Sequence, residues 1–414
     1  MDGVLTRPQL VRWRTAIFAI FFATGLGFAS WAARLPAVKI DLGINDLQIG
    51  VLLFVSGAAA IVGLSLANVI VVRWGARRGM FGTIMAFSLG LMIVGLGVQF
   101  LQSYEVTAIG LALMGAGMSA TDVMMNVEAA AVEQSFGKTL MPLFHAFFSF
   151  GTVAGAGIGV AIVAWGVGVA WHLWAVGILV LITGLASLGA VPVRELVQDE
   201  PGTKASRRER FTVALAVWRD PRTYAIGVIM LGMAFAEGSA NDWLTIAMVD
   251  GHRESQTVGA IALTVFSVAM TVFRVLGGPL VDWLGRVWTL RILSIAAVVG
   301  LVMFILAPNL PIAFVGIALW GAGASLGFPL GMSAAADDPA KAAASVSAAA
   351  TIGYLAFLCG PPILGWISHE IGILPTLWII VVLIALSGLF SGAAKPLATS
   401  TVGAGHTHSP SRSH

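Results

Sequence analysis

Two carboxylates lie inside long apolar stretches of the sequence, where an ionised side chain costs about 2.5–3.5 kcal/mol on membrane-insertion scales. Asp122 and Glu237 are each followed one helical turn later by an amide, Asn126 and Asn241. Residues four apart share one face of a helix, so each carboxyl and its amide point in the same direction. We interpret Asp122 and Glu237 as proton-coupling groups, because a carboxyl in a partly dry place can take up and release a proton. Asn126 and Asn241 are candidate solute ligands.

Three further polar residues are interpreted as structural charges. Arg274 lies in another apolar stretch, and an arginine there is usually neutralised by a carboxylate, so we expect an ion pair. His145 and Glu128 fall at similar depth in neighbouring stretches, where a local hydrogen bond is expected. The only cysteine, Cys359, lies in an apolar stretch, so the sequence predicts no disulfide, no metal site and no cofactor.

The composition defines the elements that must position these groups. The chain has 414 residues, of which 58% are hydrophobic and 10% charged, and its mean hydropathy is +0.92. Soluble domains are about 45–50% apolar and about 25% charged. These values exclude a cytosolic enzyme and a disordered scaffold, and the net charge of +3 gives no footprint for nucleic acid. The chain is expected to lie in a lipid bilayer.

The apolar stretches predict an all-α membrane protein. A bilayer core needs about 20 apolar residues per helix, and strand-type alternation is absent. The sequence contains twelve such segments, at residues 15–35, 48–72, 80–100, 106–130, 142–164, 170–191, 223–248, 258–281, 290–307, 311–334, 346–367 and 374–394.

The basic residues predict the orientation, because Lys and Arg accumulate on the cytoplasmic side. With the N-terminus inside, nineteen of the 23 basic residues lie on that side, so both termini are expected in the cytoplasm and the protein in the cell membrane. The longest connection divides the spans six and six. We therefore predict an N-terminal bundle (1–192), a cytoplasmic loop (193–222), a C-terminal bundle (223–395) and a disordered cytoplasmic tail (396–414).

The two halves resemble each other in sequence. The segment Leu111–Ser119 of span four and the segment Ile317–Ser325 of span ten share a Gly-Ala-Gly core at an offset of 206 residues. A glycine-containing basic turn follows spans two and eight at an offset of about 210. Its residues are Arg73, Gly75, Arg77 and Arg78 in the first copy, and Gly278, Asp282, Gly285 and Arg286 in the second.

Two six-helix halves with this turn resemble the major facilitator superfamily, whose loop pattern is Gly-x-x-x-Asp-(Arg/Lys)-x-Gly-x-(Arg/Lys)-(Arg/Lys). The first copy has Val72 in place of the aspartate, and the second has Trp283 in place of the first basic residue. The resemblance implies that these loops latch the cytoplasmic ends of the halves together. It also implies that spans one, four, seven and ten line a central cavity, with Asp122 opposite Glu237.

Tryptophans are assigned to the cavity or to the membrane interface according to the span in which they lie and their place in it. Trp31 and Trp320 belong to spans that line the cavity in the superfamily, so they are candidate substrate contacts. Tryptophans near span ends, such as Trp13, are expected in the interfacial belt instead.

The Asp122 to Asn126 motif and the stretch from His145 to Gly151 resemble the branch of the fucose–proton symporter and the rhizopine transport protein. In the symporter a span-four carboxylate before a matching asparagine carries a proton, which corresponds to Asp122. Its second carboxylate lies in span one, four residues before a proline. The equivalent residue here is Ala32, so Glu237 is the candidate for that second role.

The sequence thus predicts a secondary active transporter and not an enzyme. It would move a small polar organic solute (sugar, cyclitol or amino-sugar-like) with protons by alternating access, as a monomer. One alternative is a multidrug–proton antiporter. Against it, no basic residue occurs between Glu105 and Lys138, although Gly360-Pro361-Pro362 partly matches the Gly-Pro signature of that branch. A membrane sensor that binds a ligand without moving it is a further alternative.

Overall fold

The chain folds into two groups of long helices in the computed structural model, which describes residues 6–137, 140–192, 216–338 and 341–397. No strand occurs in these ranges. The helices of the first half are α1 (Arg7–Ala32), α2 (Leu35–Leu42), α3 (Asp46–Leu96), η1 (Gly97–Leu101), α4 (Tyr104–Phe136), α5 (Met141–Ala164) and α6 (Val169–Leu188). Those of the second half are α8 (Pro221–Ile246), η2 (Ala247–Gly251), α9 (Gln256–Val275), α10 (Gly277–Ile305), α11 (Leu310–Ala324), α12 (Gly327–Ala335), α13 (Ala342–Ile371), α14 (Ile373–Thr376), α15 (Trp378–Phe390) and η3 (Ser391–Ala394).

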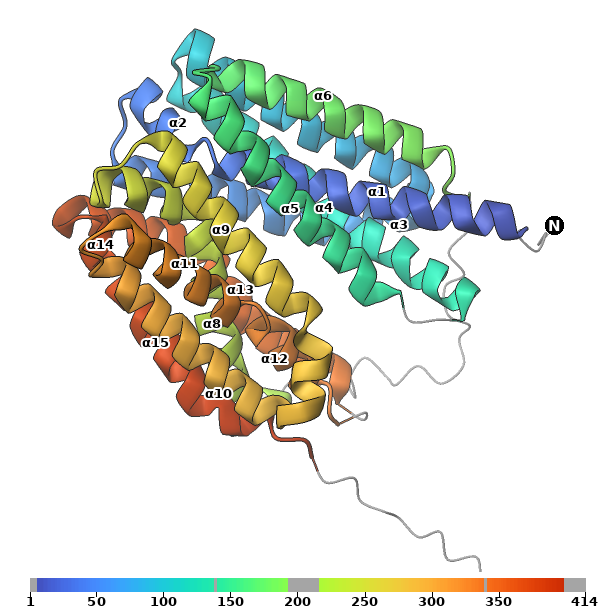
Figure 1. Ribbon diagram of the computed structural model, residues 1–414. Coiled ribbons are helices and arrows are strands. Elements are labelled where there is room, and N and C mark those ends of the chain that lie inside the picture. Colours follow the sequence, from blue (N-terminus) through green and yellow to red (C-terminus); the bar gives the residue numbers. More distant parts are fainter. Residues whose placement is uncertain (1–5, 138–139, 193–215, 339–340, 398–414) are drawn as a thin grey trace, which may run out of the picture.

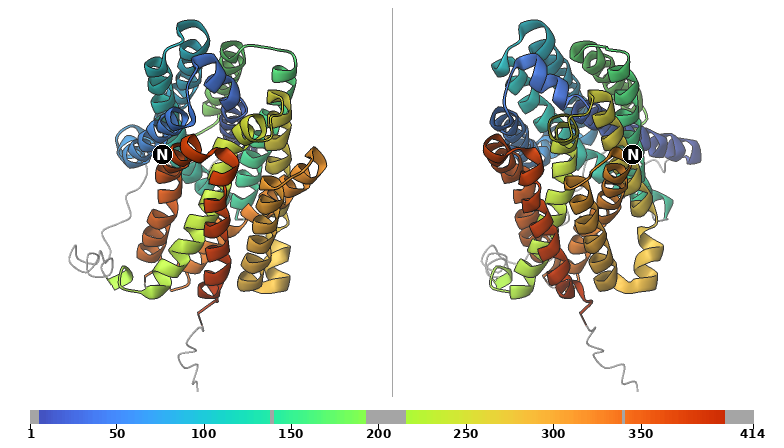
Figure 2. Two further views of the ribbon diagram at one scale, coloured as in Figure 1. Left: turned by 90° about the vertical axis from the view of Figure 1, so that its left-hand side faces the viewer. Right: turned by 60° about the vertical axis from the view of Figure 1, so that its left-hand side comes forward.

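Twelve segments of the described helices are long and apolar enough to cross a membrane, six in each half. Figure 1 shows the two halves as separate bundles, one blue to green and the other yellow to red. The views in Figure 2 show the same two groups from other sides. The predicted fold class is therefore confirmed. Most of the predicted 193–222 loop and of the 396–414 tail lies outside the described residues.

Each basic turn contains a sharp kink at a glycine, where two helical segments meet. Gly75 in α3 has φ 75° and ψ 160°, and Gly285 in α10 has φ 74° and ψ 162°. A positive φ disfavours a side chain, so the sequence places glycine at both points. The kink at Gly75 lies in α3, which contains both spans two and three. Spans eight and nine are the separate helices α9 and α10, and Gly285 lies in the first part of α10.

Helix caps repeat between the halves. Asn45 and Ser255, which are 210 residues apart, accept hydrogen bonds from the backbone N–H groups of Gln48 and Val258 at the starts of α3 and α9. Ser103 and Asn309, which are 206 residues apart, cap α4 and α11 in the same way. Each cap satisfies an N–H that the first helical turn leaves unpaired. The capping pattern therefore follows the same duplication as the turns.

The bundles approach each other at one face of the molecule. We call the face where α2, η2 and α14 lie the converging face, and the face where α1 begins the terminal face. Helix α3 packs against α13, and α5 packs against α9, across the boundary between the bundles. The two bundles meet at the converging face and spread apart toward the terminal face (Figure 1).

Candidate functional site

A charged cluster closes the converging face. The Lys39 ammonium on α2 donates to the carboxylates of Asp46, at the start of α3, and of Asp250, in η2 of the other bundle. The Ser368 hydroxyl on α13 donates to Asp46. Burial alone would lower the pKa of Lys39, but the hydrogen bonds and charges of Asp250 and Asp46 raise it above its usual value. Lys39 therefore stays charged and ties the two bundles together.

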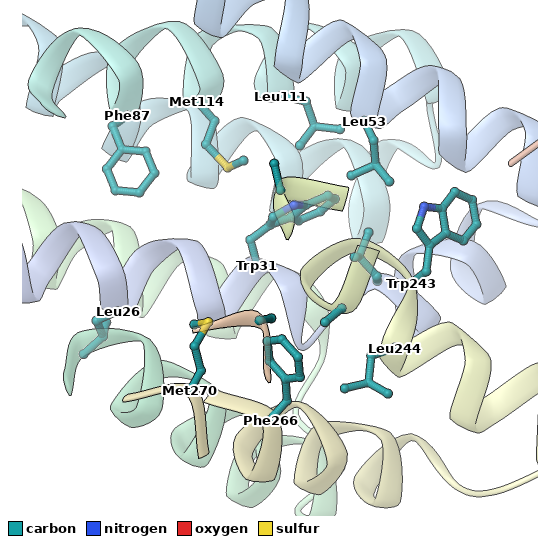
Figure 3. Close-up of a cluster of buried hydrophobic side chains, with 14 of the residues drawn as sticks. Leu26, Trp31, Leu53, Phe87, Leu111, Met114, Trp243, Leu244, Phe266 and Met270 are labelled. Atoms are coloured by element: carbon teal, nitrogen blue, oxygen red, sulfur yellow. The ribbon is translucent and has the colours of Figure 1, made fainter. Parts of the chain in front are cut away.

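An apolar layer lies beneath this cluster. Figure 3 shows Trp31 of α1 with Leu53 of α3, Leu111 of α4, and Trp243 and Leu244 of α8. All five side chains are at least 94% buried and belong to one core that spans both bundles. Apolar side chains at this density leave little room for water. The layer therefore separates the charged cluster from the polar groups deeper in the molecule.

Asp122 lies past this layer, about 27 Å along α4 from the converging end. Its side chain is exposed although it lies in mid-span. The Asn126 amide donates to the Asp122 backbone oxygen at 2.8 Å and to its carboxylate at 3.3 Å. Tyr354 on α13 lies within electrostatic range of that carboxylate. Asp122 thus faces the other bundle, and no cation of the described residues forms an ion pair with it.

Glu237 is held differently. Arg274 on α9 donates to the Glu237 carboxylate at 2.7 Å and to the Ser325 backbone oxygen at 3.1 Å. Ser325 lies where the helix is interrupted between α11 and α12. The two side chains of the pair are 26% and 20% exposed. Arg274 also interacts electrostatically with His145, on α5 of the other bundle. Asn241 is half-buried one turn beyond Glu237.

The two candidate tryptophans, Trp31 and Trp320, are packed into the protein. Trp320 lies against Phe266 and Phe304, with ring centroids 5.4 and 6.1 Å away, and it is fully buried. Trp31 is 2% exposed in the apolar layer. The interfacial placement expected for Trp13 is wrong, because Trp13 is 1% exposed. Its indole donates at 2.9 Å to Glu128, which is buried as well, and this bond fixes α1 to α4.

The second copy of the basic turn contacts its own bundle. Arg286 donates to Asp337 at 2.7 Å, and Arg222 donates to the same carboxylate at 2.8 Å. Burial alone would raise the pKa of Asp337, but hydrogen bonds and charges from Arg222 and Arg286 hold it below its usual value. Asp282 is exposed, and so is Gly278.

The first copy is more open. The guanidinium of Arg73 lies 5.9 Å from the centre of the Trp74 ring. Arg77 is half-buried, and Arg78 borders a mainly apolar groove between α3 and α4. The latch role of these turns remains a prediction.

Sequence reasoning missed three groups of polar residues. The Lys39 cluster joins residues up to 329 positions apart, and no local pattern marks it. Asp337 follows span ten on the face where the basic turns lie. That position could have indicated an ion pair between Asp337 and an arginine of this face. Asp242 is adjacent to Asn241, and its different orientation on α8 emerges only from the packing. Among the described residues, no group of three or more His, Cys, Asp or Glu could hold a metal ion.

This architecture is that of a multi-pass membrane protein with two helical bundles and polar groups between them. The chain belongs to the Major Facilitator Superfamily, whose family model matches residues 16–361 and 240–406. It is 30% identical to an uncharacterized MFS-type transporter of Yersinia pestis over 84% of this chain and 87% of that protein. It is 27% identical to the membrane protein MosC of Rhizobium meliloti over 96% and 95% of the two chains.

Solved structures share the fold. A mutant of the nucleoside transporter NupG superposes with a TM-score of 0.75 at 14% identity, over 92% of this chain and 100% of that chain. FucP in the outward conformation superposes with a TM-score of 0.66 at 13% identity, over 94% and 100%. The expected resemblance to the branch of FucP and MosC is therefore confirmed. These relatives and neighbours are transporters and not enzymes.

Proposed function

We propose that this protein is a proton-coupled secondary transporter of a small polar organic solute, such as a sugar, a cyclitol or an amino sugar, with Asp122 as its proton-binding group. The observation that carries the proposal is the contrast between two mid-span carboxylates. Arg274 neutralises Glu237, whereas Asp122 is exposed toward the other bundle with only an amide donor on its carboxylate. A carboxyl without a fixed counter-ion can change its protonation state during a transport cycle.

The remaining polar groups suit a hydroxylated solute. Asn126 and Asn241 offer amide donors and acceptors, and His145 adds a further polar group. The Glu237–Arg274 pair presents a fixed dipole with both side chains partly exposed. Similarity to a nucleoside transporter and to a fucose:proton symporter agrees with such a solute. Trp31 and Trp320, both buried, act in this proposal as packing residues.

The proposed cycle is a rocking motion of the two bundles around these groups. The excess of basic residues assigns the terminal face to the cytoplasmic side of the cell membrane, where both chain termini lie in this proposal. The structure then corresponds to the state closed to the outside, and the Lys39–Asp250 contact must break for the opposite state to form. In that opposite state the basic turns would latch the terminal face. We propose a monomer as the working unit.

The test begins with a ligand screen. A solute that binds only the folded protein raises its melting temperature, so purified protein is heated with sugars, cyclitols, amino sugars and lipophilic cations. The best ligand is then used in proteoliposomes with an imposed pH gradient. We expect gradient-driven accumulation by the wild type. Asp122→Asn should abolish this accumulation while exchange of labelled for unlabelled solute continues.

Glu105→Gln is the matched control, because it removes a carboxylate from the far end of the same helix and should leave accumulation unchanged. Undiminished accumulation by Asp122→Asn would remove Asp122 from the proposal. Binding of lipophilic cations alone would favour a multidrug antiporter. Binding of a polar solute with no flux in the wild type would favour a sensor.

A further inference from the structure

Asp242 borders a small cavity that the preceding proposal does not use. The cavity lies between α8 and α13 and offers about 10 Å³ to the centre of a water molecule, which is the space of one water. Its lining includes Asp242, Ser239 and Trp243 of α8, and Phe357, Gly360 and Pro361 of α13. The Trp243 indole N–H is buried without a hydrogen-bond partner. A carboxyl, an unpaired donor and room for one water thus meet at one place.

Nothing in the described part of the chain neutralises Asp242. No hydrogen bond or ion pair reaches its carboxyl, and no charged side chain there acts on it electrostatically. The charged groups on the surrounding helices have other partners: Arg274 binds Glu237, Lys39 binds Asp46 and Asp250, and Arg34 donates to the Val167 backbone oxygen. On α13, Tyr354 lies near Asp122, Cys359 is not part of the lining, and His369 and Glu370 lie at the exposed end of the helix.

The position of the cavity connects Asp242 to closure of the converging face. The wall formed by Phe357, Gly360 and Pro361 belongs to the part of α13 that packs against α3 of the other bundle. The contact is close: a Cβ on Gly50 of α3 would lie 2.6 Å from the Pro361 backbone oxygen. When α13 rests against both α3 and α8, Asp242 is only partly exposed, and the cavity beside it has room for one water. An ionised carboxylate there would have little water and no counter-ion, whereas the neutral acid needs neither.

We propose that Asp242 binds a proton from the side of the converging face and that this protonation permits α13 to close that face. The proton adds to a carboxylate oxygen while the face is open and water reaches the site. It leaves to water when the site is hydrated again. A metal cation is a poor occupant, because it needs several oxygen ligands and most of the lining is apolar. The inference rests on the proposed function, to which it adds a second protonation site in place of Glu237.

The test measures closure directly, without any solute. Spin labels are attached to cysteines introduced at Ile40 on α2 and Ile371 at the end of α13, both exposed, in a Cys359→Ala background of the full chain. Distances between the labels are recorded between about pH 5 and pH 9, the range between ordinary carboxyl and lysine titration. In the wild type, acidification should increase the short-distance population. Asp242→Asn, which imitates the neutral acid, should stay closed and lose this pH dependence.

The controls separate Asp242 from its neighbours. Glu105→Gln, which removes a carboxylate outside both proposed proton sites, should retain the pH dependence of the label distances. The Lys39 cluster alone would give the opposite sign, because protonation of Asp46 and Asp250 would weaken it and open the face. A wild-type-like titration of Asp242→Asn, or opening on acidification, contradicts the inference.

Asp242→Glu is the second variant, should Asp242→Asn fail to fold. It moves the carboxyl by one methylene and must shift the midpoint of closure, so an unchanged midpoint contradicts the inference as well. Absence of gradient-driven flux in the wild type would end the proposed function. The label distances would still decide the role of Asp242.

Discussion

The N-terminal and C-terminal bundles share a helical frame but differ in how they hold charge. Asn45 and Ser255 cap equivalent helices, and Gly75 and Gly285 have nearly the same backbone angles. In mid-span, however, Asp122 of the first bundle has an amide neighbour, whereas Arg274 of the second neutralises Glu237. The two halves therefore share their elements and differ at the polar positions. At these positions the first bundle has a carboxyl without an ion pair, and the second has a fixed ion pair.

The largest expected effect comes from removing one partner of the fixed pair. Arg274→Met leaves Glu237 without a counter-ion and frees the Ser325 backbone oxygen. Breaking a buried pair in this way costs about 3–5 kcal/mol, and partial exposure places this pair at the lower end. We expect a clearly lower melting temperature in detergent at neutral pH.

The double variant Arg274→Met/Glu237→Gln is the control, because it leaves no uncompensated charge and should recover most of the lost stability. Asp122→Asn should have little effect on the melting temperature, since Asp122 has no ion pair to lose. Equal destabilisation by Arg274→Met and Asp122→Asn would end the distinction between the bundles.

A smaller effect, equal in both bundles, should follow from filling the shared helix contacts. A Cβ on Gly115 would lie 2.3 Å from the Ser56 backbone oxygen, and a Cβ on Gly321 would lie 2.5 Å from that of Phe266. Overpacking of this kind costs about 1–3 kcal/mol. Gly115→Ala and Gly321→Ala should therefore lower the melting temperature by similar amounts. Gly82→Ala is the control, because its Cβ meets open space. A large difference between the melting temperatures of Gly115→Ala and Gly321→Ala would show that the helix contacts of the two bundles are not equivalent.

The smallest effect concerns the terminal face of the second bundle. Asp337→Asn removes the acceptor of Arg222 and Arg286, and the expected loss is about 1 kcal/mol at neutral pH because the cluster is partly exposed. The pKa of Asp337 is lowered in the folded protein. Its contribution is therefore complete above the unfolded value near 3.8 and is lost as the pH falls through the lower folded value. The melting temperatures of wild type and variant should converge in acid and differ at pH 7.

The sequence predicted the fold well because membrane helices carry strong local signals. Span length and caps are local features, and the repeat of residues 111–119 in 317–325 could be read directly. The turn around Gly75 was expected to be a loop between separate helices. It joins two helical segments through a single non-helical residue, and composition does not predict so short a connection.

The contacts at the site could be predicted only in part. Asp122, Glu237 and Arg274 stand out because charge is rare in apolar stretches, but the pairing of Arg274 with Glu237 and not with Asp122 depends on how the helices pack. The burial of Trp13 and Trp320 depends on neighbours far away in sequence. The different surroundings of Glu237 and Asp242 arise from the rotation of α8 against α9 and α13, which no local pattern specifies.

The most direct test of the central claim is proton exchange on solute binding. Purified protein in weakly buffered detergent solution is mixed with the solute found in the thermal screen, and a pH-sensitive dye reports the protons released or taken up. We expect an exchange in the wild type that persists in Glu237→Gln and is lost in Asp122→Asn. An exchange that persists in Asp122→Asn and disappears in Glu237→Gln would contradict this expectation, because Glu237 would then be the titrating carboxyl.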